Sequence, residues 1–221
     1  MNVLGFDTST AATAVCLTRD GELASERRPE VAALFQPPGH ARELMPAVAA
    51  VMEEAGLTFA DLDAIAVGIG PGTFTGLRIG VATARALAGS ARLELRPVSS
   101  LAALAAGIDT DAALPLIDAR RGEVFAALYQ SGRPRWGPLA APAEEVAARV
   151  RVTGLSPLAA GDGSVRFRGV LAAAGIRVEP EGSHAHVVRA LHVCRLAAAA
   201  PPAPPEAVLP EYLRLPDARP R

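Results

Sequence analysis

The sequence contains no lysine: all 22 of its basic residues are arginines. This absence excludes chemistry that needs a lysine amine, including the Walker A phosphate contact, the strand lysine of kinases and Schiff-base catalysis. A large net charge is also missing, because the 22 basic residues are nearly balanced by 23 acidic ones, which leaves a formal charge of -1. With no overall positive field to hold a polyanion, and only 4% aromatic residues to stack on bases, stand-alone nucleic-acid binding is not expected.

Cysteine and long apolar runs are scarce as well. The two cysteines, Cys16 and Cys194, form no Cys-x-x-Cys pair and fit a reducing compartment. The first residues lack the basic leader and apolar stretch of a secretory signal, and no apolar run approaches the roughly 20 residues that span a bilayer. We therefore expect a cytoplasmic protein without a membrane contact.

The composition that remains is that of a globular protein with a sizeable core. The chain has 221 residues, of which 50% are hydrophobic and 20% charged, enough for one large domain or two small ones. Apolar runs bounded by turn residues, and apolar positions at three- and four-residue spacing, predict alternating strands and helices. The predicted strands cover 3–6, 13–17, 22–28, 63–69, 93–98, 114–118 and 122–129. The predicted helices cover 40–55, 74–89, 99–106, 144–150, 165–174 and 186–200.

A short internal repeat suggests two related α/β lobes. An apolar strand that ends in Asp7 is followed by a polar turn and a second strand, and the same order recurs around Asp118. The match is short enough that chance similarity is the alternative. We predict an N-terminal lobe over 1–98 and a C-terminal lobe over 99–221, with a Pro-rich linker near 197–205.

The glycine-rich segment 68–80 is the strongest local signal. It follows a predicted strand and opens a helix, where free backbone N–H groups attract phosphate. Its spacing matches neither G-x-G-x-x-G nor a Walker loop, so a nucleotide loop is disfavoured. Within the helix, Gly76, Gly80, Ala84 and Ala88 form one small-residue stripe at four-residue spacing. The stripe fits either tight packing on the chain's own sheet or a helix interface with another molecule, and both can hold together.

The sequence shows no strong constellation of catalytic side chains. Asp7 and Asp118 at strand ends could orient a metal-bound water or a phosphate-bound metal, or could cap turns through Asx hydrogen bonds. His184, His186 and His192 match no structural-zinc spacing and are interpreted as surface residues. We predict no catalytic residue and no metal site.

Four segments together resemble the bacterial TsaB (YeaZ) family, in matching order over nearly the full chain. They are FDTST at 6–10, GPGTFTGLRIG at 70–80, IDARRGEVF at 117–125 and PEYLR at 210–214. The glycine-rich segment is the specific one, whereas the first would be weak alone. The resemblance implies a two-lobed actin/Hsp70/sugar-kinase-like α/β fold with mixed sheets flanked by helices.

The resemblance also implies a function and partners. It implies a role in making N6-threonylcarbamoyladenosine at position 37 of tRNAs that read ANN codons. A related protein, TsaD, carries the transferase site, and a small ATPase, TsaE, joins the complex. Members like this chain are non-catalytic, form a homodimer without the partner and contact tRNA only through the complex. No cofactor is expected on this chain alone, with ATP or ADP possible at the complex.

Departures from the enzymatic relatives support the non-catalytic interpretation. Asp7 is followed by Thr8 and Ser9 rather than a glycine, so with Asp118 these residues form a degenerate phosphate loop. His40 is followed by Leu44 where TsaD-like relatives carry a second metal-binding histidine. The alternative is a weak ATPase or glycoprotease-like peptidase acting on its own.

By family analogy the partner surface lies on the two early helices. The predicted interface residues are His40, Leu44, Met45, Val48, Met52, Phe74, Gly76, Leu77, Gly80, Thr83, Ala84 and Leu87.

Overall fold

The computed structural model describes residues 1–214, and its first half is a mixed five-stranded sheet. Its strand order is β3-β2-β1-β4-β5, in which β1 pairs antiparallel with β2 and parallel with β4. The strands are β1 (Val3–Asp7), β2 (Ala14–Arg19), β3 (Glu22–Arg27), β4 (Ala64–Gly70) and β5 (Glu94–Ser99).

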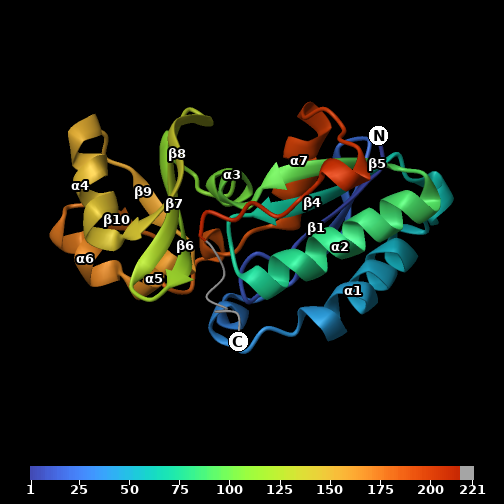
Figure 1. Cartoon of the computed structure of the whole chain (residues 1–221), viewed down its shortest axis with the longest axis horizontal. Coiled ribbons are helices and arrows are strands. Elements are labelled where there is room, and N and C mark those ends of the chain that lie inside the picture. Colours follow the sequence, from blue (N-terminus) through green and yellow to red (C-terminus); the bar gives the residue numbers. More distant parts are fainter. Residues whose placement is uncertain (215–221) are drawn as a thin grey trace, which may run out of the picture.

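Helices cover both faces of this sheet because successive strand residues point to opposite sides. Leu4 and Phe6 of β1 pack against α1 (His40–Ala55) and α2 (Phe74–Ala91). Val3 packs on the other face with α3 (Ser100–Ala105) and α7 (Ala190–Ala199). In Figure 1, α1 and α2 lie side by side with their N-terminal ends toward the second sheet. Short 3-10 turns cover Val31–Phe35, Phe59–Asp61, His184–His186 and Pro205–Ala207.

The second half is a mixed five-stranded sheet of order β10-β9-β6-β7-β8. Its strands are β6 (Ala112–Arg120), β7 (Glu123–Gln130), β8 (Arg133–Pro142), β9 (Leu158–Ala160) and β10 (Arg177–Val178). Helices α4 (Ala143–Thr153), α5 (Asp162–Arg166) and α6 (Arg168–Ala173) complete it. The two mixed sheets flanked by helices confirm the predicted α/β class.

The chain returns to the first sheet after completing the second. Helix α7 packs on β1 and β2, and the backbone N–H of Ala203 donates to the Leu95 carbonyl oxygen at 2.8 Å. The sequence did not indicate this return. The division of the chain at residues 98 and 99 stays a prediction, and the last seven residues of the predicted second lobe, 215–221, lie outside the described residues.

Several predicted elements differ from the observed ones. Strands β8, β9 and β10 were not predicted. The helix expected over 165–174 is two short helices that meet at Phe167, and the helix expected from residue 186 begins at Ala190. No helix within residues 1–214 is long and apolar enough to cross a membrane.

Candidate functional site

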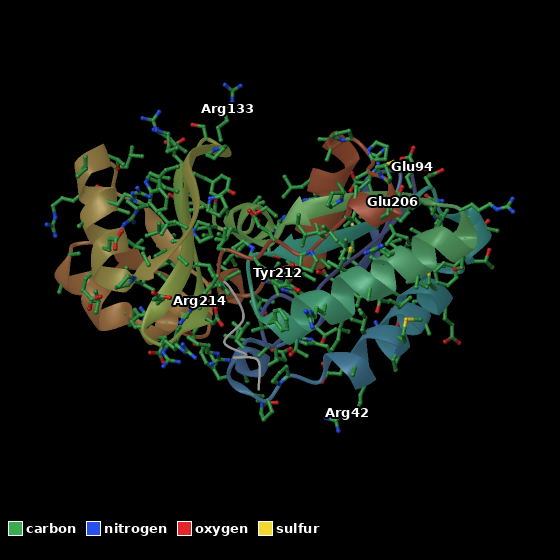
Figure 2. All side chains as sticks on the ribbon, in the orientation of Figure 1. Arg42, Glu94, Arg133, Glu206, Tyr212 and Arg214 are labelled. Atoms are coloured by element: carbon green, nitrogen blue, oxygen red, sulfur yellow. The ribbon has the colours of Figure 1, made fainter. Side chains whose placement is uncertain are left out.

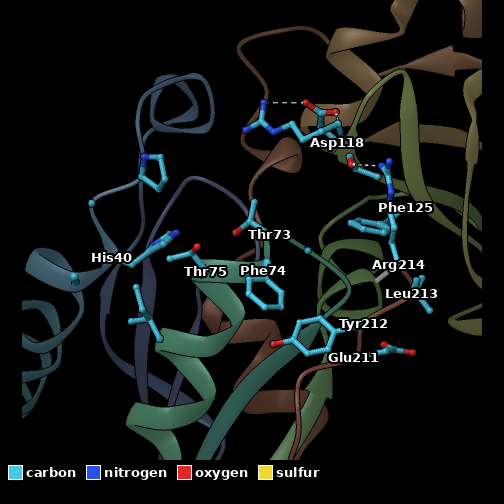
Figure 3. Close-up of a pocket in the computed structure, with 18 of the residues that line it drawn as sticks. His40, Thr73, Phe74, Thr75, Asp118, Phe125, Glu211, Tyr212, Leu213 and Arg214 are labelled. Carbon is cyan, nitrogen blue, oxygen red and sulfur yellow. Dashed lines mark hydrogen bonds and ion pairs between the residues drawn. The ribbon is translucent and has the colours of Figure 1, made fainter. Parts of the chain in front are cut away.

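A cavity of about 620 Å³ lies where the first turns of α1 and α2 face the β6–β7 turn. Figure 3 shows His40 and Phe74 on one side, Asp118 and Phe125 on the other, and the C-terminal strap, residues 210–214, along a third. The two halves of the chain and its C-terminal end therefore build one site.

The Asp7 carboxylate does not reach this cavity. It is buried and accepts hydrogen bonds from the Ser9 backbone N–H (2.8 Å), the Ser9 hydroxyl (2.6 Å) and the Ser100 hydroxyl (2.6 Å). Burial raises its pKa, although these donors partly offset the effect. The bond to the Ser9 N–H is the Asx turn that the sequence left open as the structural alternative.

Asp118 is also occupied by neighbouring groups. Its Oδ2 lies 3.2 Å from Arg120 Nη1 and 2.9 Å from Arg166 Nη1, and its Oδ1 accepts the Arg120 backbone N–H at 2.8 Å. Its own N–H donates to Asp162 Oδ1 at 3.0 Å. The Asp7 and Asp118 carboxylates are thus both held by donors of the chain itself. Within residues 1–214 no group of three or more His, Cys, Asp or Glu side chains could hold a metal ion.

The Asp162 carboxyl adds a pH-sensitive group beside Asp118. Burial raises the pKa of Asp162 to about 6, and the charge of Asp118 acts in the same direction. Backbone N–H donors and Arg120 oppose the shift. The pKa of this carboxyl is thus higher in the folded chain than in the unfolded chain, so its protonation stabilises the fold. That stabilisation is complete below pH 3.8, the ordinary pKa, and is lost as the pH rises through about 6.

We expect Asp162→Asn to remove this loss while keeping the oxygen that accepts the Asp118 N–H. The free energy of unfolding of the wild type should fall relative to the variant by about 2–3 kcal/mol between roughly pH 4 and pH 7. Urea titrations of both proteins across that range measure the difference, and parallel pH profiles would contradict it.

The small-residue stripe of α2 faces the chain's own Thr8. The Thr8 hydroxyl donates to the Gly76 carbonyl oxygen at 2.8 Å. A Cβ at Gly76 would overlap the Thr8 carbonyl oxygen, and one at Gly80 would overlap the Thr8 hydroxyl. This placement favours the alternative of tight packing within the chain, because the glycines are needed where the helix meets the β1–β2 turn.

The other predicted interface residues divide by exposure. Met45 is 46% exposed on α1, and Phe74, Thr83 and Leu87 are partly exposed on α2. The rest are buried: His40, Leu44, Val48, Met52, Leu77 and Ala84. A partner in contact with α1 and α2 therefore meets the outward faces, not the apolar face that helical spacing made conspicuous.

His40 is a buried structural residue in this site. Its Nε2 lies 3.0 Å from the Thr10 carbonyl oxygen and its Nδ1 lies 2.8 Å from the Thr13 hydroxyl. Burial lowers its pKa, which favours the neutral ring. Both ring nitrogens are engaged, so His40 offers no free nitrogen to a ligand.

The C-terminal strap joins the two halves through side chains that sequence reasoning did not place in the site. The Tyr212 ring lies 5.1 Å from the Phe74 ring, and its hydroxyl accepts from Arg78 Nε at 3.3 Å. Arg214 pairs with Glu123 of β7 at 3.1 Å. The only signal for them was the segment PEYLR at 210–214, which gave no indication of its contacts.

Comparison with known proteins matches the sequence of this chain to one family. The family model described as "TsaD: tRNA N6-adenosine threonylcarbamoyltransferase" matches residues 28–165, more than half of the chain. The chain is 38% identical over 136 residues to the tRNA threonylcarbamoyladenosine biosynthesis protein TsaB of Escherichia coli. That match covers 59% of this chain and 55% of the relative, so the chain spans just over half of the curated protein's length.

Solved structures extend the likeness over nearly the whole chain. YeaZ from Pseudomonas aeruginosa superimposes with a TM-score of 0.77 and 28% identity, covering 96% of this chain and 99% of that one. A ROK hexokinase from Thermus thermophilus, at 14% identity and a TM-score of 0.53, covers 90% of this chain and 99% of its own. The hexokinase likeness concerns the fold alone, and it confirms the actin/Hsp70/sugar-kinase-like architecture.

Proposed function

The chain belongs to the TsaB (YeaZ) family, related to the TsaD threonylcarbamoyltransferases, and from this premise we propose that it is a non-catalytic partner subunit. It binds a TsaD-like transferase in the cytoplasm and promotes transfer of a threonylcarbamoyl group to adenosine 37 of tRNAs that read ANN codons. A TsaE-like ATPase joins the larger complex, where ATP or ADP binds. Without the transferase, the chain pairs with a second copy of itself.

One observation carries this proposal: the polar groups at the enzyme-like positions are all engaged within the chain. Asp7 is bonded to Ser9 and Ser100, Asp118 is paired with two arginines, and both nitrogens of His40 are engaged. A general base or a metal ligand must present a lone pair that substrate or metal can reach, and these three side chains are buried. The alternative of an independent ATPase or peptidase gains no support from these residues.

The outward faces of α1 and α2 supply the docking surface. Met45 is exposed on α1, and Phe74, whose ring also contacts Tyr212, is partly exposed at the start of α2. Methionine and aromatic side chains are enriched at protein interfaces because they bury much area and adapt their shape. The buried stripe on the opposite face of α2 packs this helix on the β1–β2 turn.

We expect Met45→Arg to weaken binding to the cognate transferase at least about 30-fold, since a central apolar contact contributes about 2 kcal/mol or more. Sedimentation velocity of the mixture measures the association, and urea unfolding checks that the variant folds. Val152→Arg is the matched control, because Val152 is 89% exposed on α4, away from this surface. Wild-type-like binding by Met45→Arg would refute the surface, and a wild type that never associates would refute the partner role.

A further inference from the structure

Three exposed arginines at the outer edge of the second sheet form no ion pair within residues 1–214, unlike those arginines of the chain that pair with a carboxylate. Arg189 pairs with Glu26 and Arg214 with Glu123. Arg133, Arg135 and Arg149 are exposed, and none of them forms an ion pair with any residue in the range 1–214. We call these three residues the arginine edge.

The arginine edge is built on strand β8 and the helix that packs on it. Figure 2 shows Arg133 at the tip of the β7–β8 hairpin, projecting away from the rest of the molecule. Arg135 is the extra residue of a bulge between the Tyr129–Pro134 and Leu128–Trp136 pairs, and bulges re-aim side chains. The Arg149 guanidinium lies 5.7 Å from the Trp136 ring centroid, which holds its charge beside the strand.

The backbone of β8 is a poor template for another strand. It is the last strand of its sheet, and Pro134 and Pro138 carry no N–H to donate to an added peptide. What this edge offers is side-chain charge. Guanidinium groups present paired N–H donors that match phosphate oxygens.

We propose that the arginine edge binds the phosphodiester backbone of RNA. This proposal rests on the proposed function, because the RNA in question is the tRNA that the complex modifies. The edge supplies charge alone, so it binds any RNA sequence and adds to the affinity of the assembled complex. Because the whole chain carries a net charge of -1, this contact is local, and its contribution falls steeply with salt.

Trp136 makes the test specific to this surface, because it is the only tryptophan of the chain. We expect its fluorescence to change on titration of the full chain with a transcribed tRNA. Three phosphate contacts predict that affinity falls about 30-fold between roughly 50 and roughly 200 mM salt. The double variant Arg133→Ala/Arg135→Ala should bind about tenfold more weakly, with a shallower salt dependence. The control Arg28→Ala/Arg195→Ala removes the same charge from exposed arginines outside this edge.

The outcomes separate this proposal from the partner role. An unchanged Trp136 signal with tRNA, or equal losses in the double variant and its control, would overturn it. A response to polyglutamate but not to tRNA would overturn it in favour of an acidic protein. Sedimentation with the transferase reports the proposed function independently, since RNA binding is measured on the chain alone.

Discussion

Replacing Gly76 by alanine should strongly destabilise the fold, with an expected loss of about 4 kcal/mol in the free energy of unfolding. The added Cβ would overlap the Thr8 carbonyl oxygen, which is backbone and cannot rotate away, and would approach Thr73 Oγ1 to 2.6 Å. Overpacking a tight contact costs about 1–3 kcal/mol where neighbours can shift. Here the hydrogen bond from the Thr8 hydroxyl to the Gly76 carbonyl oxygen is strained as well. Urea unfolding followed by circular dichroism measures the effect.

Gly89 provides the control on the same helix. A Cβ at Gly89 meets nothing within 4 Å, so Gly89→Ala should stabilise the chain by about 0.5–1 kcal/mol through helix propensity. If both alanine variants had wild-type stability, the close contact between α2 and the β1–β2 turn would be refuted. The pair also shows why a bulky Gly76 or Gly80 variant cannot test partner binding, since it would disrupt the fold first.

Local sequence signals predicted the elements whose hydrophobic pattern and end signals agree. The helix expected over 40–55 is observed as His40–Ala55, and Gly56 ends it in the left-handed conformation with a φ of 63°. Its apolar spacing and its terminal glycine are both short-range features. The Asp-ended strands β1 and β6 were likewise predicted, because each is an apolar run bounded by turn residues.

Strand β8 shows where local signals mislead. Its sequence, RPRWGPLAAP, carries three prolines and a glycine, and these residues predict an interrupted strand. The strand forms because it pairs on one side only, with β7, and an edge position tolerates prolines that donate no N–H. Whether a strand lies at an edge is a property of the whole sheet and cannot be read from ten residues.

The candidate site illustrates the same limit. The pattern of α2 identified a face of small residues, but not which surface that face contacts. That face contacts Thr8, which lies 68 residues before Gly76. The strap residue Tyr212 meets Arg78 across 134 residues. Such contacts depend on how elements distant in the chain pack together, which local spacing does not encode.

The ion pair between Glu26 and Arg189 fastens the returning C-terminal segment to the first sheet, and its loss should be costly. Arg189 Nε lies 2.9 Å from Glu26 Oε1, and its Nη2 lies 2.8 Å from Oε2. The Glu26 side chain is only 9% exposed. We expect Arg189→Met to reduce the free energy of unfolding by about 3–5 kcal/mol, because it leaves a nearly buried carboxylate without its partner.

The pair between Arg27 and Glu54 gives a matched comparison for that prediction. It joins β3 to α1, but its side chains are 40% and 50% exposed, so water replaces the lost partner and Arg27→Met should cost less than about 1 kcal/mol. Adding Glu26→Gln to Arg189→Met should recover part of the loss, since it removes the unpaired charge. Equal costs for the two single variants, measured by urea unfolding, would mean that α7 is held to β1 and β2 by apolar packing alone, with the buried pair contributing nothing beyond a surface one.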